Sequence, residues 1–89
     1  MILSLMSKIE KLLDKVKNNS HNARFDDICK LAEAFGFQRK AGKGSHRVYS
    51  QKGVTEILNF QNVKGLVKPY QVKQFLWIIE EYDLTMKEE

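Results

Sequence analysis

The spacing of hydrophobic residues predicts helices at both ends of the chain. Near the beginning, apolar residues recur at steps of three and one, which is typical of an amphipathic helix with one apolar stripe. This stripe consists of Ile2, Leu5, Met6, Ile9, Leu12, Leu13 and Val16. A polar cluster, "NNSHN", follows at residues 18–22, and such clusters mark turns. We therefore predict an N-terminal helix within residues 1–20.

Two further segments show the same helical spacing of apolar residues. One extends over residues 25–35, with two acids in its first turn, where the helix dipole favours anions. Gly36 is suited to end it, because glycine readily adopts the left-handed conformation found after helices. The other extends over residues 69–82 and begins at Pro69, which fits a first helical turn. Its apolar stripe consists of Val72, Phe75, Leu76, Ile79 and Tyr82.

Between these helices the hydrophobic period changes from about 3.6 to about 2, which predicts strands. Three short β-prone runs, "FQRKA", "SHRVYS" and "VTEILNF", occupy residues 37–41, 45–50 and 54–60. Their short connections favour an antiparallel meander. The expected fold class is α+β: a three-stranded antiparallel sheet with helices on one face and the other face exposed, plus the extra N-terminal helix.

The length of 89 residues predicts a single domain, made of the N-terminal helix (1–20) and the α+β unit (21–89). Cys29 is the one cysteine of the chain, so no intramolecular disulfide can form, which fits a reducing cytosol. The apolar opening "MILSLMS" is too short for a signal peptide or a membrane span. We expect a soluble cytoplasmic protein with no membrane partner.

Positive charge is concentrated in the middle of the chain. Residues 37–75 hold eight cations and one acid, Glu56, whereas residues 76–89 hold five acids and one cation, Lys87. A concentrated positive field suits a phosphodiester backbone or an acidic protein, although charge runs are often only solvated surface. The residues expected to contact RNA are Arg39, Lys40, Lys43, Gly44, Ser45, Arg47, Lys64, Lys68 and Lys73.

The topology predicts where this charge gathers. In a meander, the start of the second strand lies beside the end of the third, so His46 is expected near Asn59 and Phe60, and near the start of the last helix. Free backbone N–H groups at a helix start bind anions, and Lys64 and Lys68 flank this start. Cations, a helix N-terminus and one histidine are thus expected at the same edge of the sheet.

These groups suit cleavage of RNA without a metal. A histidine, whose pKa is ordinarily about 6.5, can take the proton of the 2′-hydroxyl, and cations can stabilise the charge on the phosphate. The sequence shows no metal-ligand spacing, and neither Ser45 nor Cys29 has partners that would activate a nucleophile. His46 is the candidate catalytic base, with no cofactor. Alternatively, His46 is a structural residue at the rim of the core, if Val48 on the same strand face is buried.

Four other residues have competing interpretations. Tyr49 is a candidate for stacking on a base, but a strand tyrosine more often packs against a neighbouring strand. Trp77 is expected in the core rather than on a binding surface. His21, in a polar loop, is expected to be a turn residue, and Cys29 to pack as a small apolar residue.

The sequence Lys43-Gly44-Ser45-His46, at the start of the middle strand, resembles the HicA toxins. The resemblance covers about residues 24–83 and includes "FGF" before the first strand and the aromatic Tyr49. It implies a fold like that of double-stranded-RNA-binding domains and a metal-independent mRNA interferase, an endoribonuclease, with His46 as the catalytic residue. It also implies a HicB-type antitoxin that covers the active site. Relatives often carry a further histidine or basic cluster after the third strand, where this chain has no histidine.

Two other functions remain open. One is a non-catalytic RNA-binding module of the same fold, in which Lys64, Lys68 and Lys73 bind phosphates across a groove largely by shape. The other is a protein-interaction domain whose basic face meets an acidic partner.

Overall fold

The computed structural model describes residues 7–87 of the 89-residue chain. Its elements in chain order are helix α1 (Lys8–Asn18), the 3-10 helix η2 (Ser20–Asn22), helix α2 (Phe25–Ala34), strands β1 (Gln38–Ala41), β2 (His46–Gln51) and β3 (Val54–Gln61), and helix α3 (Pro69–Glu81). The expected α+β class and the three-stranded antiparallel sheet are confirmed. Each bound of the three strands and of α2 and α3 lies within one residue of its prediction.

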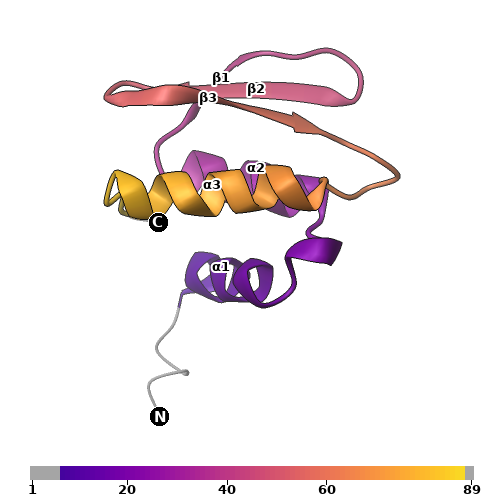
Figure 1. Ribbon diagram of the computed structural model, residues 1–89, viewed down its shortest axis with the longest axis horizontal. Helices are drawn as coiled ribbons and strands as arrows, with labels where there is room; N and C mark the ends of the chain where they lie inside the picture. The colour runs from indigo at the N-terminus through magenta and orange to yellow at the C-terminus, as the bar shows by residue number, and fades with distance from the viewer. Residues whose placement is uncertain (1–6, 88–89) are drawn as a thin grey trace.

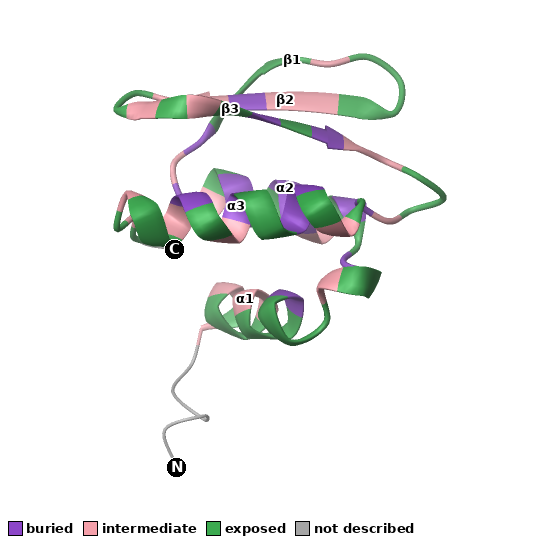
Figure 2. Ribbon diagram, in the orientation of Figure 1, coloured by how far each residue is buried: buried purple, intermediate pink, exposed green. Residues whose placement is uncertain are grey.

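The elements form three layers (Figure 1). The sheet is the first layer, α2 and α3 cover one of its faces as the second, and α1 lies beyond these two helices as the third. Within residues 7–87 no helix covers the other face of the sheet, as expected for an α+β unit with one open face. Figure 2 shows the buried residues mainly on the sheet and on α2 and α3.

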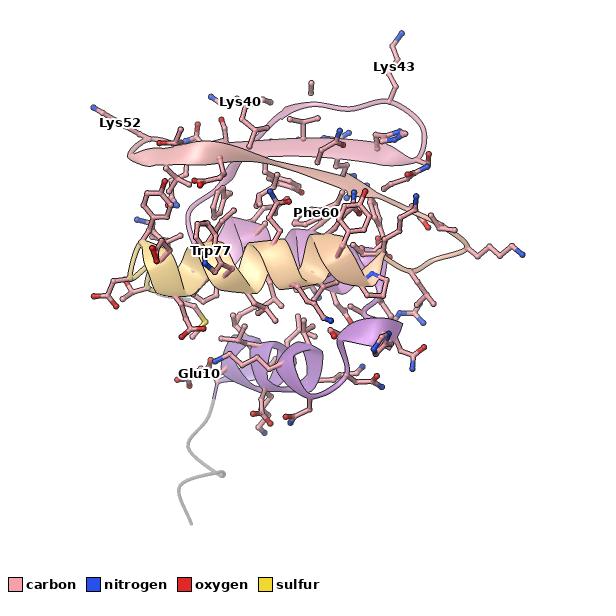
Figure 3. All side chains as sticks on the ribbon, in the orientation of Figure 1. Glu10, Lys40, Lys43, Lys52, Phe60 and Trp77 are labelled. Atoms are coloured by element: carbon pink, nitrogen blue, oxygen red, sulfur yellow. The ribbon has the colours of Figure 1, made fainter. Side chains whose placement is uncertain are left out.

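The core of the second layer is built around Phe75 of α3. Its ring makes edge-to-face contacts with Phe35, Phe37 and Phe60, at centroid distances of 6.2, 6.2 and 5.9 Å. Such arrangements bring the positive ring edge against the negative ring face and stabilise the pair beyond the buried area. Phe60 lies between sheet and helices in Figure 3, so this aromatic cluster sets the distance between the two layers.

Helix α1 begins at Lys8 because Ser7 caps it. The Ser7 hydroxyl accepts from the Glu10 N–H at 3.1 Å, and the Glu10 carboxylate accepts from the Ser7 N–H at 2.9 Å, a capping box. Val16 is buried in the common core, and other residues of the predicted stripe pack against it. Ile2, Leu5 and Met6 lie outside the described residues.

The sheet has the order β1-β2-β3, and its register decides which residues face the helices. Tyr49 of β2 lies opposite Leu58 of β3, and both are fully buried. Because side chains alternate along a strand, Val48 and His46 point to the open face. The interpretation of His46 as a structural residue at the rim of the core required a buried Val48. It is not supported, because Val48 is only half-buried and His46 is exposed.

No helix in the part of the chain from residue 7 to residue 87 is long and apolar enough to cross a membrane.

Candidate functional site

His46 is the first residue of β2 and lies directly opposite Gln61, near the end of β3. Asn59, two residues earlier in β3, lies opposite Val48 and shares the open face. The expected proximity of His46 to the end of the third strand is thus confirmed, with Gln61 rather than Phe60 as its direct neighbour. The imidazole is exposed on the open face, where a large ligand can approach it.

The loop between β1 and β2 fixes the start of β2 through an unusually close backbone approach. Gly42 has a φ of +137°, and a Cβ atom placed on it would lie 2.5 Å from the carbonyl oxygen of His46 and 2.9 Å from the Cα of Arg47. Only glycine fits such a position. The His46 N–H donates to the carbonyl of Lys43 at 3.0 Å, which closes the loop. Lys43 and Gly44, both exposed, therefore lie next to His46.

On the other side, β3 and the loop after it hold the same strand start. The Asn62 N–H donates to the carbonyl of Ser45 at 2.6 Å. Within that loop, Lys64 and Gly65 have φ values of 54° and 87°, and Val63 and Leu66 exchange two backbone hydrogen bonds around them. Two consecutive residues with positive φ between paired residues are typical of a type I′ turn. This turn presents the exposed Lys64 side chain at the His46 end of the sheet.

Gln71 links helix α3 to the strand opposite His46. Its side-chain amide donates to the carbonyl of Asn59 at 2.6 Å, and its side-chain oxygen accepts from the N–H of Gln61 at 3.2 Å. It is the buried polar residue of α3, at 8% exposure. Sequence reasoning missed this residue, although its spacing from Phe75 and Ile78 places it on the buried stripe of the helix.

The start of α3 lies at the same end of the sheet as the β1–β2 loop (Figure 1). Lys68 is the N-cap residue, Pro69 follows at the first helical position, and no side chain caps the helix. Because α3 packs on the covered face and His46 projects from the open face, the two share an end of the sheet rather than a face. The expected gathering is thus confirmed only as a shared end of the sheet, because α3 begins at the end where His46 starts β2.

The remaining expected RNA contacts are spread over the molecule. Arg47 points to the covered face, where its guanidinium lies 5.1 Å from the centroid of the Phe25 ring in α2, a cation–π contact. Arg39 and Lys40 lie on the edge strand β1, and Lys73 is exposed on the second turn of α3. Of the nine residues, Lys43, Gly44 and Ser45 lie in the loop that leads into His46, and Lys64 and Lys68 lie in the segment between β3 and α3, at the same end of the sheet.

Tyr49 is not available to a base, so the packing interpretation is confirmed and the stacking interpretation is wrong. Its ring is fully buried, and its hydroxyl donates to a carboxylate oxygen of Glu33 at 2.8 Å. Burial, and then the hydrogen bond to Glu33, raise the pKa of Tyr49 well above its usual range. Cys29 is also buried, as expected, and burial raises the pKa of its thiol, which disfavours the reactive thiolate.

Two aromatic residues of α3 are exposed instead. Trp77, expected in the core, is 51% exposed, and Tyr70 is 63% exposed. They lie seven residues apart, which is two helical turns, so they share one face of α3 with Lys73 between them. The prediction for Trp77 is wrong because the residue lies nearly opposite Phe75 around the helix, off the apolar stripe.

Chemically, the His46 end offers one exposed imidazole, neutral amides and several lysines. In residues 7–87 no three His, Cys, Asp or Glu side chains are close enough together to hold a metal ion. The one ion pair of this part of the chain joins Lys15 and Asp27, at 4.0 Å, so Lys43, Lys64 and Lys68 keep their charges free for an anionic ligand. The arrangement can accept a proton and stabilise negative charge.

Comparison with known proteins yields no relative. No protein-family model matches the chain, and no curated protein and no solved structure is significantly similar to it. The function is therefore inferred from the geometry of the site and from the short motif that contains His46.

Proposed function

We propose that this protein is a metal-independent endoribonuclease that cleaves mRNA, with His46 as the catalytic base. The observation that carries the proposal is the position of His46. It is an exposed imidazole on the open face of the sheet, fixed by the Gly42 contact on one side and by β3 on the other, with Lys43, Lys64 and Lys68 at the same end. The backbone on both sides of His46 is thus held by contacts, and its surroundings are cationic, as a site for a phosphodiester requires.

In the proposed reaction, the imidazole of His46 takes the proton of a 2′-hydroxyl group. The 2′-oxygen then forms a bond to the adjacent phosphorus, and the bond from phosphorus to the 5′-oxygen of the next nucleotide breaks. Water supplies a proton to this leaving oxygen, so the products are a 2′,3′-cyclic phosphate and a 5′-hydroxyl end. Lys43 and Lys64 stabilise the negative charge that accumulates on the phosphate oxygens.

We further propose that the protein is the toxin of a toxin–antitoxin system, neutralised by an antitoxin of the HicB type. Lys43-Gly44-Ser45-His46 supports this, because the motif lies at the start of the middle strand, as in the HicA toxins that the chain resembles. An exposed catalytic base in a cationic site has no means of switching itself off. Inhibition then requires a partner, and both proteins act where mRNA is translated, in the cytoplasm.

The deciding experiment compares the two histidines of the chain. His46→Ala should reduce RNA cleavage by about 100-fold or more, since general-base catalysis typically contributes that much. His21→Ala is the matched control, because His21 is exposed in η2, outside the candidate site. Cleavage should continue in EDTA and leave 2′,3′-cyclic phosphate ends. If both variants cleave RNA and arrest bacterial growth as the wild type does, His46 is not the catalyst.

The second candidate is a non-catalytic RNA-binding module. It is favoured by the exposed face of α3, where Tyr70, Lys73 and Trp77 combine aromatic rings that can stack on bases with a cation that can contact phosphate. Under this alternative the wild-type protein binds RNA, and binding weakens in Trp77→Ala, but the RNA stays intact and expression is harmless.

A further inference from the structure

A cationic cavity lies at the opposite end of the sheet from His46. Its volume is about 520 Å³, and we call it the lysine pocket. Its lining residues are Gly36, Gln38, Lys40, Ser50, Gln51, Lys52 and Lys87. Figure 3 shows Lys52 at one end of the sheet and Lys43, in the loop next to His46, at the other.

The pocket is formed where the chain leaves α2 and enters β1. Gly36, with a φ of +95°, makes this turn, and a Cβ atom on it would lie 2.8 Å from the Cε of Lys87. The side chain of Gln51 donates to the carbonyl of Phe35 at 2.9 Å. After α3 the chain returns to α2, where the Lys87 N–H donates to the carbonyl of Ala34 at 2.7 Å. These contacts bring a lysine from the end of the chain over the bare backbone of Gly36.

The lining of the pocket suits an oxyanion. Three of its side chains are lysines from three separate segments, and none of the lining residues within the described part of the chain, residues 7–87, is an acid. Lys40 is held by Gln38, whose side-chain oxygen lies 3.5 Å from the ammonium group. Ser50 adds a hydroxyl donor. Three like charges around one cavity repel one another, and an anion between them relieves that repulsion.

The pocket and His46 are connected along one strand. Ser50 lines the pocket, and His46 and Ser50 alternate with Tyr49 and Arg47, so both lie on the open face of β2. The five residue steps from His46 to Gln51 span about 17 Å at about 3.3 Å each. This is the rise of about five stacked nucleotides at about 3.4 Å each.

We propose that the lysine pocket binds a phosphate group of the RNA strand, about five nucleotides from the phosphate that is cleaved at His46. This inference rests on the proposed function, since it takes RNA as the substrate. In this arrangement the RNA runs along the open face of β2 from His46 to the lysine pocket. The pocket thereby sets the minimum length of RNA that binds tightly.

The test measures binding, separately from cleavage. The probes are labelled single-stranded RNAs of about 12 and about 3 nucleotides, of which only the longer can reach both sites, and the protein carries His46→Ala so that the RNA stays intact. The variant is Lys52→Gln with Lys87→Gln, and the matched control is Lys8→Gln with Lys17→Gln in α1. Circular dichroism verifies that both variants are folded. Inorganic phosphate is titrated in parallel, with the backbone amides of Gly36 and Gln51 followed by NMR.

The pocket variant should bind the longer RNA more weakly, with a salt dependence smaller by about 0.7 for each lost contact to a single strand. Its affinity for the shorter RNA should equal that of the control. Equal binding of the longer RNA by both variants overturns the proposal. It is also overturned if phosphate shifts the two amides while RNA binding is unaffected, because the pocket then serves free phosphate. If RNA binds through the lysine pocket but the wild-type protein does not cleave it, the endoribonuclease proposal is wrong. The proposal that the pocket binds an RNA phosphate is then still supported.

Discussion

The backbone of Gly42 lies against that of His46 so closely that a Cβ atom at Gly42 would be 2.5 Å from the His46 carbonyl oxygen. Gly42→Ala must therefore displace the start of β2 or the loop. We expect it to lower the free energy of unfolding by at least about 2 kcal/mol, since both the contact and the positive φ are unfavourable, and to reduce RNA cleavage further than that loss explains.

Gly44→Ala is the control for this prediction. Gly44 also has a positive φ, of 57°, but a Cβ atom there would meet nothing within 4 Å. Gly44→Ala should lower the free energy of unfolding by only about 1 kcal/mol, which is the cost of the backbone strain alone. Urea unfolding and a cleavage assay on both variants measure the difference, and equal effects would show that the close approach does not position His46.

Gln71 should contribute to stability through its two hydrogen bonds to β3. Gln71→Leu leaves the carbonyl of Asn59 and the N–H of Gln61 without these partners, which typically costs about 1–3 kcal/mol. Hydrogen exchange of the Gln61 amide should become faster. Gln74→Leu, at an exposed position of the same helix, should change neither the stability nor the exchange of Gln61. An unchanged Gln61 amide in Gln71→Leu would contradict the role inferred from the structure.

Stability should fall at alkaline pH because of Tyr49. Burial raises the pKa of Tyr49 in the folded chain, so above about pH 10, where an unfolded tyrosine ionises, the folded state binds more protons than the unfolded state. The free energy of unfolding then decreases as pH rises. In Tyr49→Phe this decrease should be smaller, and Cys29, whose pKa burial also raises, should contribute to the remainder. Tyr70→Phe, which changes an exposed ring, should retain the full decrease.

RNA binding should weaken with salt, since lysines at the His46 end are free of ion pairs within residues 7–87. Each of Lys43→Gln, Lys64→Asn and Lys68→Gln should lower the slope of log affinity against log salt by about 0.7. Asparagine is chosen at residue 64 because the φ of 54° there suits it better than glutamine. Lys8→Gln in α1 should leave the slope unchanged. An affinity that does not depend on salt would contradict a cationic binding site.

The proposed antitoxin should cover His46. We expect it to present acidic side chains to Lys43 and Lys64, which would accelerate the encounter, and to bury Ile57, which is 60% exposed and points to the open face next to the buried Leu58. In the complex, hydrogen exchange at the His46 ring should slow, while that at His21 should not. A complex that still cleaves RNA and leaves His46 as reactive as in the free protein would exclude occlusion.

The helices and strands could be predicted from the sequence because their hydrophobic periods are clear. The face that β2 buries could not, because Val48 and Tyr49 are both apolar and point in opposite directions. The register resolves the ambiguity: Tyr49 lies opposite Leu58, and the alternation of β3 buries Leu58 and Phe60 while it exposes Ile57 and Asn59. Such pairing is a property of two strands, so no single run of residues reveals it.

The candidate site, too, could be predicted only in part. His46, its neighbouring loop and the cations of the next loop follow from strand order alone. Gln71 and the lysine pocket do not, because they depend on contacts between segments far apart in the chain, such as that between Lys87 and Ala34. Trp77 was expected in the core because it is hydrophobic. Its position on the helix, nearly opposite Phe75, instead predicts an exposed side chain.

Gln71 also affects how this protein can associate with other chains. β3 is an outer strand of the sheet, and outer strands invite another chain to pair with their free backbone groups. Near the His46 end those groups are occupied by the amide of Gln71, which bonds as an additional strand would. The opposite outer strand, β1, is only four residues long, interrupted by a bulge, and carries Arg39 and Lys40. The β1 margin and the part of β3 next to His46 are thus protected against strand addition, which guards the folded protein against edge-to-edge aggregation at these places.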